Sequence, residues 1–125
     1  MIAYSTLGVH DMDRAVAFYD AVFEPLEAKR DVTSPTWTGY RRAGETGHFF
    51  LTRPFDRAEA SVGNGTMLAF LAKDRPAVDA FHRRALAHGG VCEGPPGVRQ
   101  GMDPVFYAAY VRDPDGNKLC AFVRR

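Results

Sequence analysis

Cysteine and histidine are the residues of this chain best suited to nucleophilic or metal chemistry, and there are few of them. The two cysteines, Cys92 and Cys120, lie far apart and outside any CxxC motif, so the sequence indicates neither a zinc cluster nor a redox pair. Cys120 lies between Leu119 and Ala121, which offer no base to activate a nucleophile. We expect Cys120 to be a buried, unreactive thiol. A domain of this length needs no disulfide, so free thiols indicate a reducing compartment and a cytoplasmic protein.

The four histidines are spread along the chain. His10 precedes one expected helix, and His82 and His88 lie within and after another, where surface or capping roles are expected. His48 precedes Phe50 by two residues, so both side chains share one face if the segment is a strand. One histidine without a second strong ligand does not make a metal site. No Ser–His–Asp order, phosphate-binding loop or paired carboxylate motif is present in the sequence either.

Aromatic and cationic side chains give a second set of candidate ligand contacts. Trp37 and Tyr107 lie on expected strands, although packing against a sheet is the ordinary role of a single tryptophan. Arg99 lies in the glycine-bounded segment 97–101. An arginine in such a loop can close over an anionic group, while a solvated surface arginine explains the residue equally well.

Two amphipathic helices are expected to position these side chains. The first begins at Asp11, whose carboxylate suits a helix N-cap, and it ends at Glu24 because proline follows. The second begins at Asp74 and ends before the pair of glycines at residues 89–90. Apolar residues recur at three- and four-residue spacing in both, so each helix has one face for a core.

Strands are expected before each helix and in pairs after it. Alternating or continuous apolar runs predict strands at residues 2–9, 36–42, 48–53, 67–72, 105–112 and 117–123. We expect residues 67–72 to be buried, residues 28–34 to be a loop or an edge strand, and residues 93–104 to be a loop with at most a short strand. The Asp-Pro-Asp-Gly sequence at 113–116 predicts a tight hairpin turn.

The strand–aspartate–helix sequence occurs twice. Asp11, Ala17 and Phe18 have equivalents 63 residues later in Asp74, Ala80 and Phe81. Such a period indicates a duplicated module. We therefore expect one domain over residues 1–125, with a first module at about 1–60 and a second at about 65–125. Two modules that face each other would form a cleft, where a ligand is expected.

Composition limits the classes of function. The chain has 125 residues, of which 46% are hydrophobic and 25% charged, and its formal net charge is +1. These values are typical of a globular protein, and the scattered basic residues do not indicate nucleic-acid binding. No segment has the length and apolarity of a membrane span. The first nine residues lack the features of a signal peptide.

Two motifs give the chain a family resemblance. Residues 8–19 (GVHDMDRAVAFY) and residues 110–118 (YVRDPDGNK), with the similar segment 74–90, resemble the vicinal oxygen chelate superfamily of glyoxalase I, extradiol dioxygenases and bleomycin and fosfomycin resistance proteins. The resemblance implies an α+β fold of two βαβββ modules, whose curved mixed sheets surround a cleft. In metal-dependent members the cleft holds a divalent ion bound by His, Gln or Glu.

The positions that correspond to the family's metal ligands carry unsuitable side chains in this chain. They fall on Tyr4, on Phe50 or a residue near it, on Met67 and on Cys120. Divalent ions of the family take imidazole, carboxylate or water ligands, whereas a thioether suits softer ions. We therefore expect no metal and no other cofactor.

The resemblance then favours a protein that binds without metal, as bleomycin resistance proteins do. We expect a cytoplasmic homodimer whose cleft binds a small apolar or aromatic molecule, with no nucleic acid or membrane as partner. The expected cleft residues are Tyr4, Trp37, His48, Phe50, Met67, Arg99, Tyr107 and Cys120. One alternative is a divalent-metal-dependent lyase, isomerase or dioxygenase of the glyoxalase type, so catalysis is left open. Another is a non-catalytic module whose dimer surface matters more than any ligand.

Overall fold

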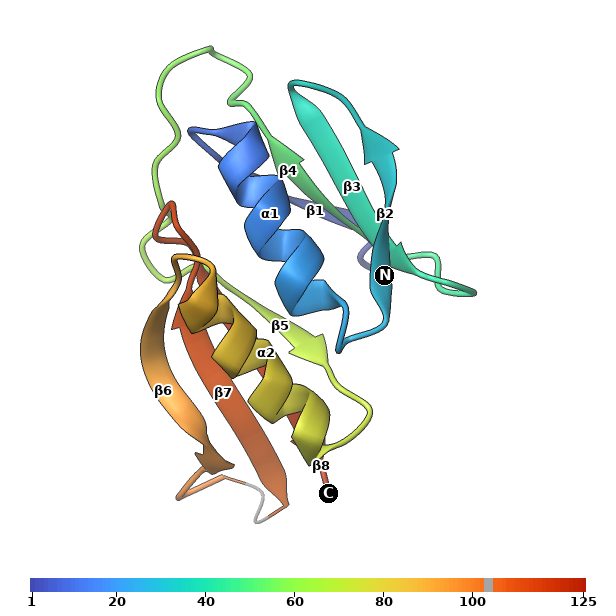
Figure 1. Cartoon of the computed structure of the whole chain (residues 1–125), viewed down its shortest axis with the longest axis vertical. Helices are drawn as coiled ribbons and strands as arrows, with labels where there is room; N and C mark the ends of the chain where they lie inside the picture. The colour runs from blue at the N-terminus through green and yellow to red at the C-terminus, as the bar shows by residue number, and fades with distance from the viewer. Residues whose placement is uncertain (103–104) are drawn as a thin grey trace.

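A computed structural model describes residues 1–102 and 105–125 and shows the same order of elements twice (Figure 1). Each half is a strand, a helix and three strands. The first half holds β1 (Tyr4–Gly8), α1 (Met12–Phe23), β2 (Ala28–Thr33), β3 (Trp37–Arg42) and β4 (His48–Thr52). The second half holds β5 (Met67–Leu71), α2 (Arg75–Ala87), β6 (Val91–Val98), β7 (Phe106–Arg112) and β8 (Lys118–Arg124).

Each half forms its own four-stranded mixed sheet. The strand orders are β1-β4-β3-β2 and β5-β8-β7-β6. In both sheets the first strand pairs in parallel with the last, and the remaining neighbours are antiparallel. The predicted α+β fold of two βαβββ modules is confirmed.

The helices begin and end for the reasons that the sequence suggested. The side chain of Asp11 accepts a hydrogen bond from the backbone N–H of Arg14, and Asp74 accepts one from Ala77. These carboxylates satisfy backbone donors that the first helical turn leaves free. The first helix ends at Phe23, before the proline, and the second at Ala87, before Gly89 with its φ of +90°.

The structure corrects the predictions for residues 93–104 and 67–72, and it decides between the loop and the edge strand expected for residues 28–34. The sequence predicts a loop with at most a short strand at residues 93–104, but residues 93–98 belong to the eight-residue strand β6, whose backbone pairs with β7 despite two register shifts. Residues 103 and 104 of that predicted loop lie outside the described residues. Strand β5 is not buried. It is an edge strand, and Met67 and Leu71 are 41% and 52% exposed. The polar segment β2 is an edge strand of the first sheet.

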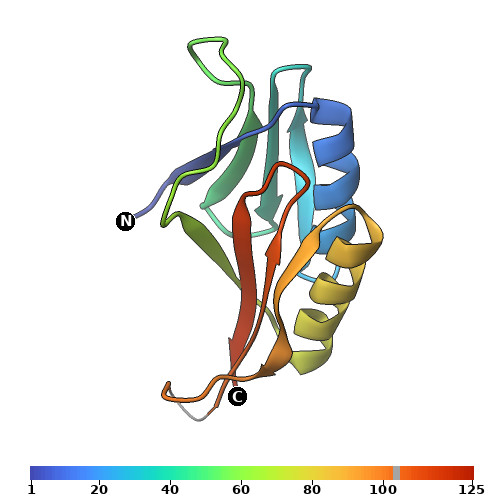
Figure 2. The same cartoon turned by 90° about the vertical axis from the view of Figure 1, so that its left-hand side faces the viewer.

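Both helices cover the same side of the molecule and lie side by side (Figure 2). Their apolar faces and the inner faces of both sheets form one core, which includes Phe18, Val22, Val78 and Phe81. Within residues 1–102 and 105–125, the opposite face of each sheet carries no helix, and we call it the open face. Neither helix is long and apolar enough to span a membrane within the described residues.

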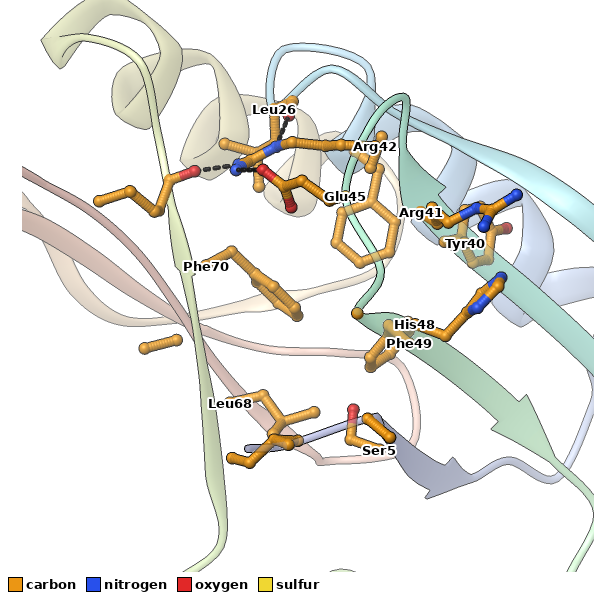
Figure 3. A pocket seen from close by; sticks show the side chains of 17 residues that line it. Ser5, Leu26, Tyr40, Arg41, Arg42, Glu45, His48, Phe49, Leu68 and Phe70 are labelled. Atoms are coloured by element: carbon orange, nitrogen blue, oxygen red, sulfur yellow. Dashed lines mark hydrogen bonds and ion pairs between the residues drawn. The ribbon is translucent and has the colours of Figure 1, made fainter.

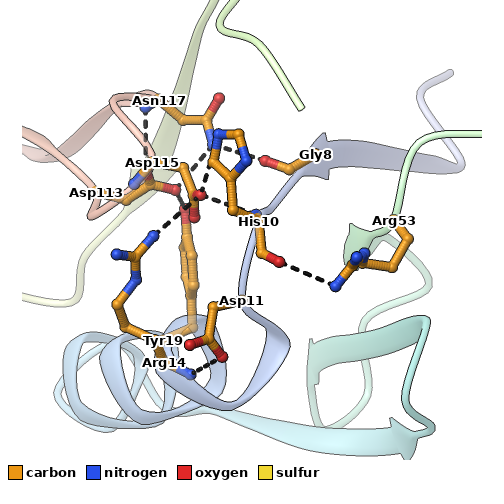
Figure 4. Close-up of polar contacts among 9 residues, drawn as sticks. All are labelled: Gly8, His10, Asp11, Arg14, Tyr19, Arg53, Asp113, Asp115 and Asn117. Carbon is orange, nitrogen blue, oxygen red and sulfur yellow. Dashed lines mark hydrogen bonds and ion pairs between the residues drawn. The ribbon is translucent and has the colours of Figure 1, made fainter. Parts of the chain in front are cut away.

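The tight turn at residues 113–116 joins the two modules through polar contacts (Figure 4). Asp113, only 2% exposed, accepts hydrogen bonds from the Tyr19 hydroxyl at 2.6 Å and from the Asn117 amide at 3.0 Å. Asn117 also donates to the Gly8 carbonyl, and Asp115 accepts from the His10 backbone. The turn of the second module thereby holds the β1–α1 corner of the first.

Candidate functional site

Three rings are stacked in a column on the open face of the first sheet. The Phe50 ring lies between His48, with ring centroids 4.8 Å apart, and Trp37, at 4.7 Å. The ring planes differ by only 17° and 29°. Tyr4 contacts Phe50 edge-on at 5.7 Å and is 60% exposed. Four of the expected cleft residues therefore lie together, and we call them the aromatic column.

Strand alternation and one glycine explain the column. Along β4, Phe49 and Leu51 point into the core, so His48 and Phe50 lie on the open face. A Cβ on Gly39, in the neighbouring strand β3, would lie 2.5 Å from the nearest atom of the Phe50 ring. Glycine at this position gives the ring space to lie across the sheet.

A charged pair adjoins the column. His48 Nε2 lies 2.7 Å from Asp31 Oδ2, and Arg41 Nε lies 3.1 Å from the same oxygen. Asp31 is brought there by an irregularity in β2: the register with β3 shifts between Arg30 and Val32, which leaves Asp31 without a partner residue. Such bulges change the direction of a side chain and are frequent beside functional sites.

No pattern in the sequence indicated Asp31 or Arg41 as site residues. Segment 28–34 is polar and without a clear period, and a bulge depends on the partner strand. Asp31 and Arg41 can be identified only from their positions next to His48 in the folded sheet.

An apolar pocket opens beside His48, between the two modules (Figure 3). Its volume is about 460 Å³, and its walls include Phe23, Leu26, Phe49, Leu68 and Phe70. Figure 3 shows His48 and Arg41 on one side, with Phe70 and Leu68 on β5 across from them. The size and the apolar walls with few polar groups are typical of small-molecule sites.

A second pocket adjoins the other end of the column. It has a volume of about 610 Å³ and lies between Trp37 and the linker residues 53–56 and 59–61. Its lining is more polar, with Thr6, Thr52 and Asp56 among its residues. The column thus extends from an apolar pocket to a polar one.

Met67 and Cys120 belong to the other sheet. Cys120 is buried on the open face of the second sheet, with Phe106 and Ala108. Burial raises the pKa of its thiol to about 11, which agrees with the expected unreactive thiol. Met67 pairs with Lys118 on edge strand β5. Within the described residues, no hydrogen bond, ion pair or ring contact joins either residue to the aromatic column.

Tyr107 and Arg99 are also apart from the column. Tyr107 faces helix α2, where its hydroxyl donates to Asp79 at 2.6 Å, and this hydrogen bond raises its pKa. Arg99 follows β6 and donates to the backbone carbonyls of Pro95 and Ala108. Its guanidinium lies over the Tyr110 ring. Arg99 is therefore held by the second module.

The side chains at the family's metal positions do not fit a divalent ion. Tyr4, Phe50, Met67 and Cys120 are divided between two sheets and offer no imidazole or carboxylate. His48 is the nearest imidazole, and Asp31 already holds its Nε2. Among the described residues, no three His, Cys, Asp or Glu side chains gather where they could hold a metal.

Comparisons with known proteins agree with the fold. A family model described as Glyoxalase/Bleomycin resistance protein/Dioxygenase superfamily matches residues 1–121. A crystal structure of a glyoxalase/bleomycin resistance protein from Albidiferax ferrireducens T118 is similar with a TM-score of 0.89 and 39% identity. That alignment covers 100% of this chain and 99% of the other. A search of the curated proteins gave no match.

Two more distant solved structures share the fold. A glyoxalase-related enzyme from Fulvimarina pelagi has a TM-score of 0.77 at 21% identity, over 98% of this chain and 87% of that one. Lactoylglutathione lyase from Agrobacterium tumefaciens has a TM-score of 0.70 at 23% identity, over 98% and 92%.

Proposed function

Because this chain belongs to the glyoxalase/bleomycin resistance protein/dioxygenase superfamily, we propose that it binds a small, partly apolar or aromatic molecule without a divalent metal. The observation that carries the proposal is the aromatic column, whose stacked rings lie on a face that no helix covers. Flat ligands stack well on such rings. The unsuitable side chains at the family's metal positions support binding without metal.

The apolar pocket can enclose one end of the ligand. His48 lies at its boundary, since the same side chain lines the pocket and stacks on Phe50. A ligand ring placed against Tyr4 and Phe50 reaches the boundary of this pocket at His48. The polar second pocket, next to Trp37, is less suited to such a group.

We also propose that the protein is a cytoplasmic homodimer. Large apolar side chains are exposed on β1 and β5, each of which is one of the two edge strands of its sheet: Tyr4, Met67 and Leu71. Covering such residues favours association. Light scattering coupled to size exclusion should give twice the mass of the chain, and the mass of a single chain would refute the dimer.

Trp37 supplies the test of binding, because it is the only tryptophan and belongs to the column. Its fluorescence should be quenched on titration with the nitroaromatic probe 4-nitroanisole in the presence of EDTA. Phe50→Leu should weaken binding about two- to tenfold, since one stacking contact is lost. Leu86→Ala, which changes an exposed apolar side chain on α2, should leave the affinity unchanged.

The result also separates the alternatives. Binding that requires stoichiometric Ni²⁺, Zn²⁺, Mn²⁺ or Fe²⁺, with EDTA abolishing it, would favour a metal-dependent glyoxalase-type enzyme. If Phe50→Leu and Leu86→Ala weakened binding equally, the aromatic column would not be the binding site. If neither 4-nitroanisole nor other flat probes bound, the alternative of a non-catalytic module whose dimer surface matters more than any ligand would be favoured.

A further inference from the structure

His48 and Asp31 form a pair that the fold does not require for its core. Both side chains lie on the open face and keep contact with solvent, as does Arg41. Exposed ion pairs of this kind contribute little to stability, ~0–1 kcal/mol. The pair nevertheless has a short 2.7 Å contact, and it occurs where a bulge and Gly39 leave space for it.

Asp31 fixes the protonation of the His48 ring. A carboxylate can only accept, so it holds the proton of His48 on Nε2. Nδ1 is then the unprotonated nitrogen of the neutral ring. Within residues 1–102 and 105–125 Nδ1 has no hydrogen-bond partner, and it is not among the buried unpartnered atoms. Nδ1 of His48 is therefore an accessible proton acceptor at the edge of the aromatic column.

Among the described residues, the charged groups around His48 are one carboxylate and two cations. Asp31 stabilises the imidazolium that forms when Nδ1 takes a proton. Arg41, which contacts the same oxygen of Asp31, and Lys29, the cross-strand partner of Arg41, supply positive charge for an anion nearby. Tyr4, the cross-strand partner of His48 on β1, is a further titratable group beside it.

We propose that Asp31 and His48 form an acid–base pair that selects ligands carrying an acidic hydroxyl group, a phenol or an enol, beside a flat unsaturated ring. The inference rests on the proposed function, since the ring must stack on the column. On binding, the O–H bond of the ligand breaks, its electron pair stays on oxygen, and an N–H bond forms at His48 Nδ1. The step consumes no oxidant and no metal. Asp31 keeps its contact with Nε2, takes no proton from the ligand and acts as a positioning residue.

The test compares two probes of nearly equal shape, 4-nitrophenol and 4-nitroanisole. Only the first has an acidic hydroxyl, and its phenolate absorbs at longer wavelength than its phenol. At a pH where free 4-nitrophenol is mostly protonated, adding the protein should produce the phenolate absorption. The phenol should also bind about tenfold or more tightly than the anisole, as expected for a hydrogen bond to a charged group.

Variants connect the effect to the pair. His48→Gln and Asp31→Asn should abolish both the phenolate absorption and the preference for the phenol, so that each variant binds the phenol and the anisole with affinities within about twofold of each other. His88→Gln, a matched change at an exposed histidine after α2, should leave both intact. Histidine NMR of the wild-type protein should show the proton of His48 on Nε2, which needs no variant to fold.

The outcomes distinguish this inference from the proposed function. Equal binding of both probes, without phenolate absorption, would overturn the acid–base pair and leave ring binding in place. A proton on Nδ1 of free His48 would overturn it as well. If neither probe binds, the proposed function and the inference both fail.

Discussion

The hydrogen bond between Tyr19 and Asp113 should be one of the strongest single polar contacts in the fold. It joins α1 of the first module to the 113–116 turn of the second, at 2.6 Å between two side chains that solvent barely reaches. Tyr19→Phe removes only the hydroxyl. A hydrogen bond to a charged group contributes about 1.5–3 kcal/mol. Since Asp113 Oδ2 keeps the Asn117 amide at 3.0 Å, we expect a loss of about 2 kcal/mol.

Tyr40→Phe is the matched control. Tyr40 is equally buried, but its hydroxyl bonds to Asp20, which is 41% exposed and can bind water instead. The control should lose less than about 1 kcal/mol. Urea unfolding measures both free energies, and the 2 kcal/mol corresponds to a Tm lower by about 6–10 °C in a chain of this size. A Tyr19→Phe loss no larger than that of Tyr40→Phe would refute the role of the buried contact.

The same residue predicts how stability depends on pH. Burial, and then the charge of Asp113, raises the pKa of Tyr19 well above its usual value of 10. Above pH 10 the unfolded chain loses this proton while the folded chain keeps it. The stabilisation is therefore complete below about pH 10 and falls above it by ~1.4 kcal/mol per pH unit. The advantage of wild type over Tyr19→Phe should narrow at that rate; a constant difference up to pH 11 would contradict it.

Two further predictions concern the open faces. Gly39→Ala places a Cβ 2.5 Å from the Phe50 ring, so the ring must move and the Trp37 stack must open. Trp37 emission should shift, and 4-nitroanisole should bind at least about threefold more weakly; unchanged emission and affinity would show that the ring yields without disturbing the column. Burial raises the pKa of Cys120 to about 11, whereas Cys92 is exposed, so a thiol reagent at pH 8 should label Cys92 alone in the folded protein and both cysteines in urea. Rapid labelling of Cys120 in the folded state would contradict its burial.

Local signals in the sequence determined the elements well. The caps at Asp11 and Asp74 depend only on residues within one turn, and both are present in the structure. The turn at 113–116 is equally local. Because these signals repeat at a fixed spacing, the order of elements in both modules could be predicted, as could the placement of His48 and Phe50 on one face of their strand.

Features that depend on strand pairing could not be predicted. The bulge that exposes Asp31 exists only relative to β3. Strand β7 is buried on both faces, with Ala108, Ala109 and Val111 all inaccessible, so alternation could not tell which face holds Tyr107. The apolar pocket arises where β5 and the β1–β4 edge leave a gap between modules, and no local pattern encodes that gap.

The central claim is that a small aromatic molecule binds on the aromatic column without metal. A crystal structure of the protein soaked with 4-nitroanisole in the presence of EDTA tests it most directly. We predict the probe ring in stacking contact with the Tyr4–Phe50 surface, with one end in the apolar pocket next to His48. A probe ring bound instead on the open face of the second sheet, beside Cys120, or a site that fills only when a divalent metal is restored, would contradict the claim.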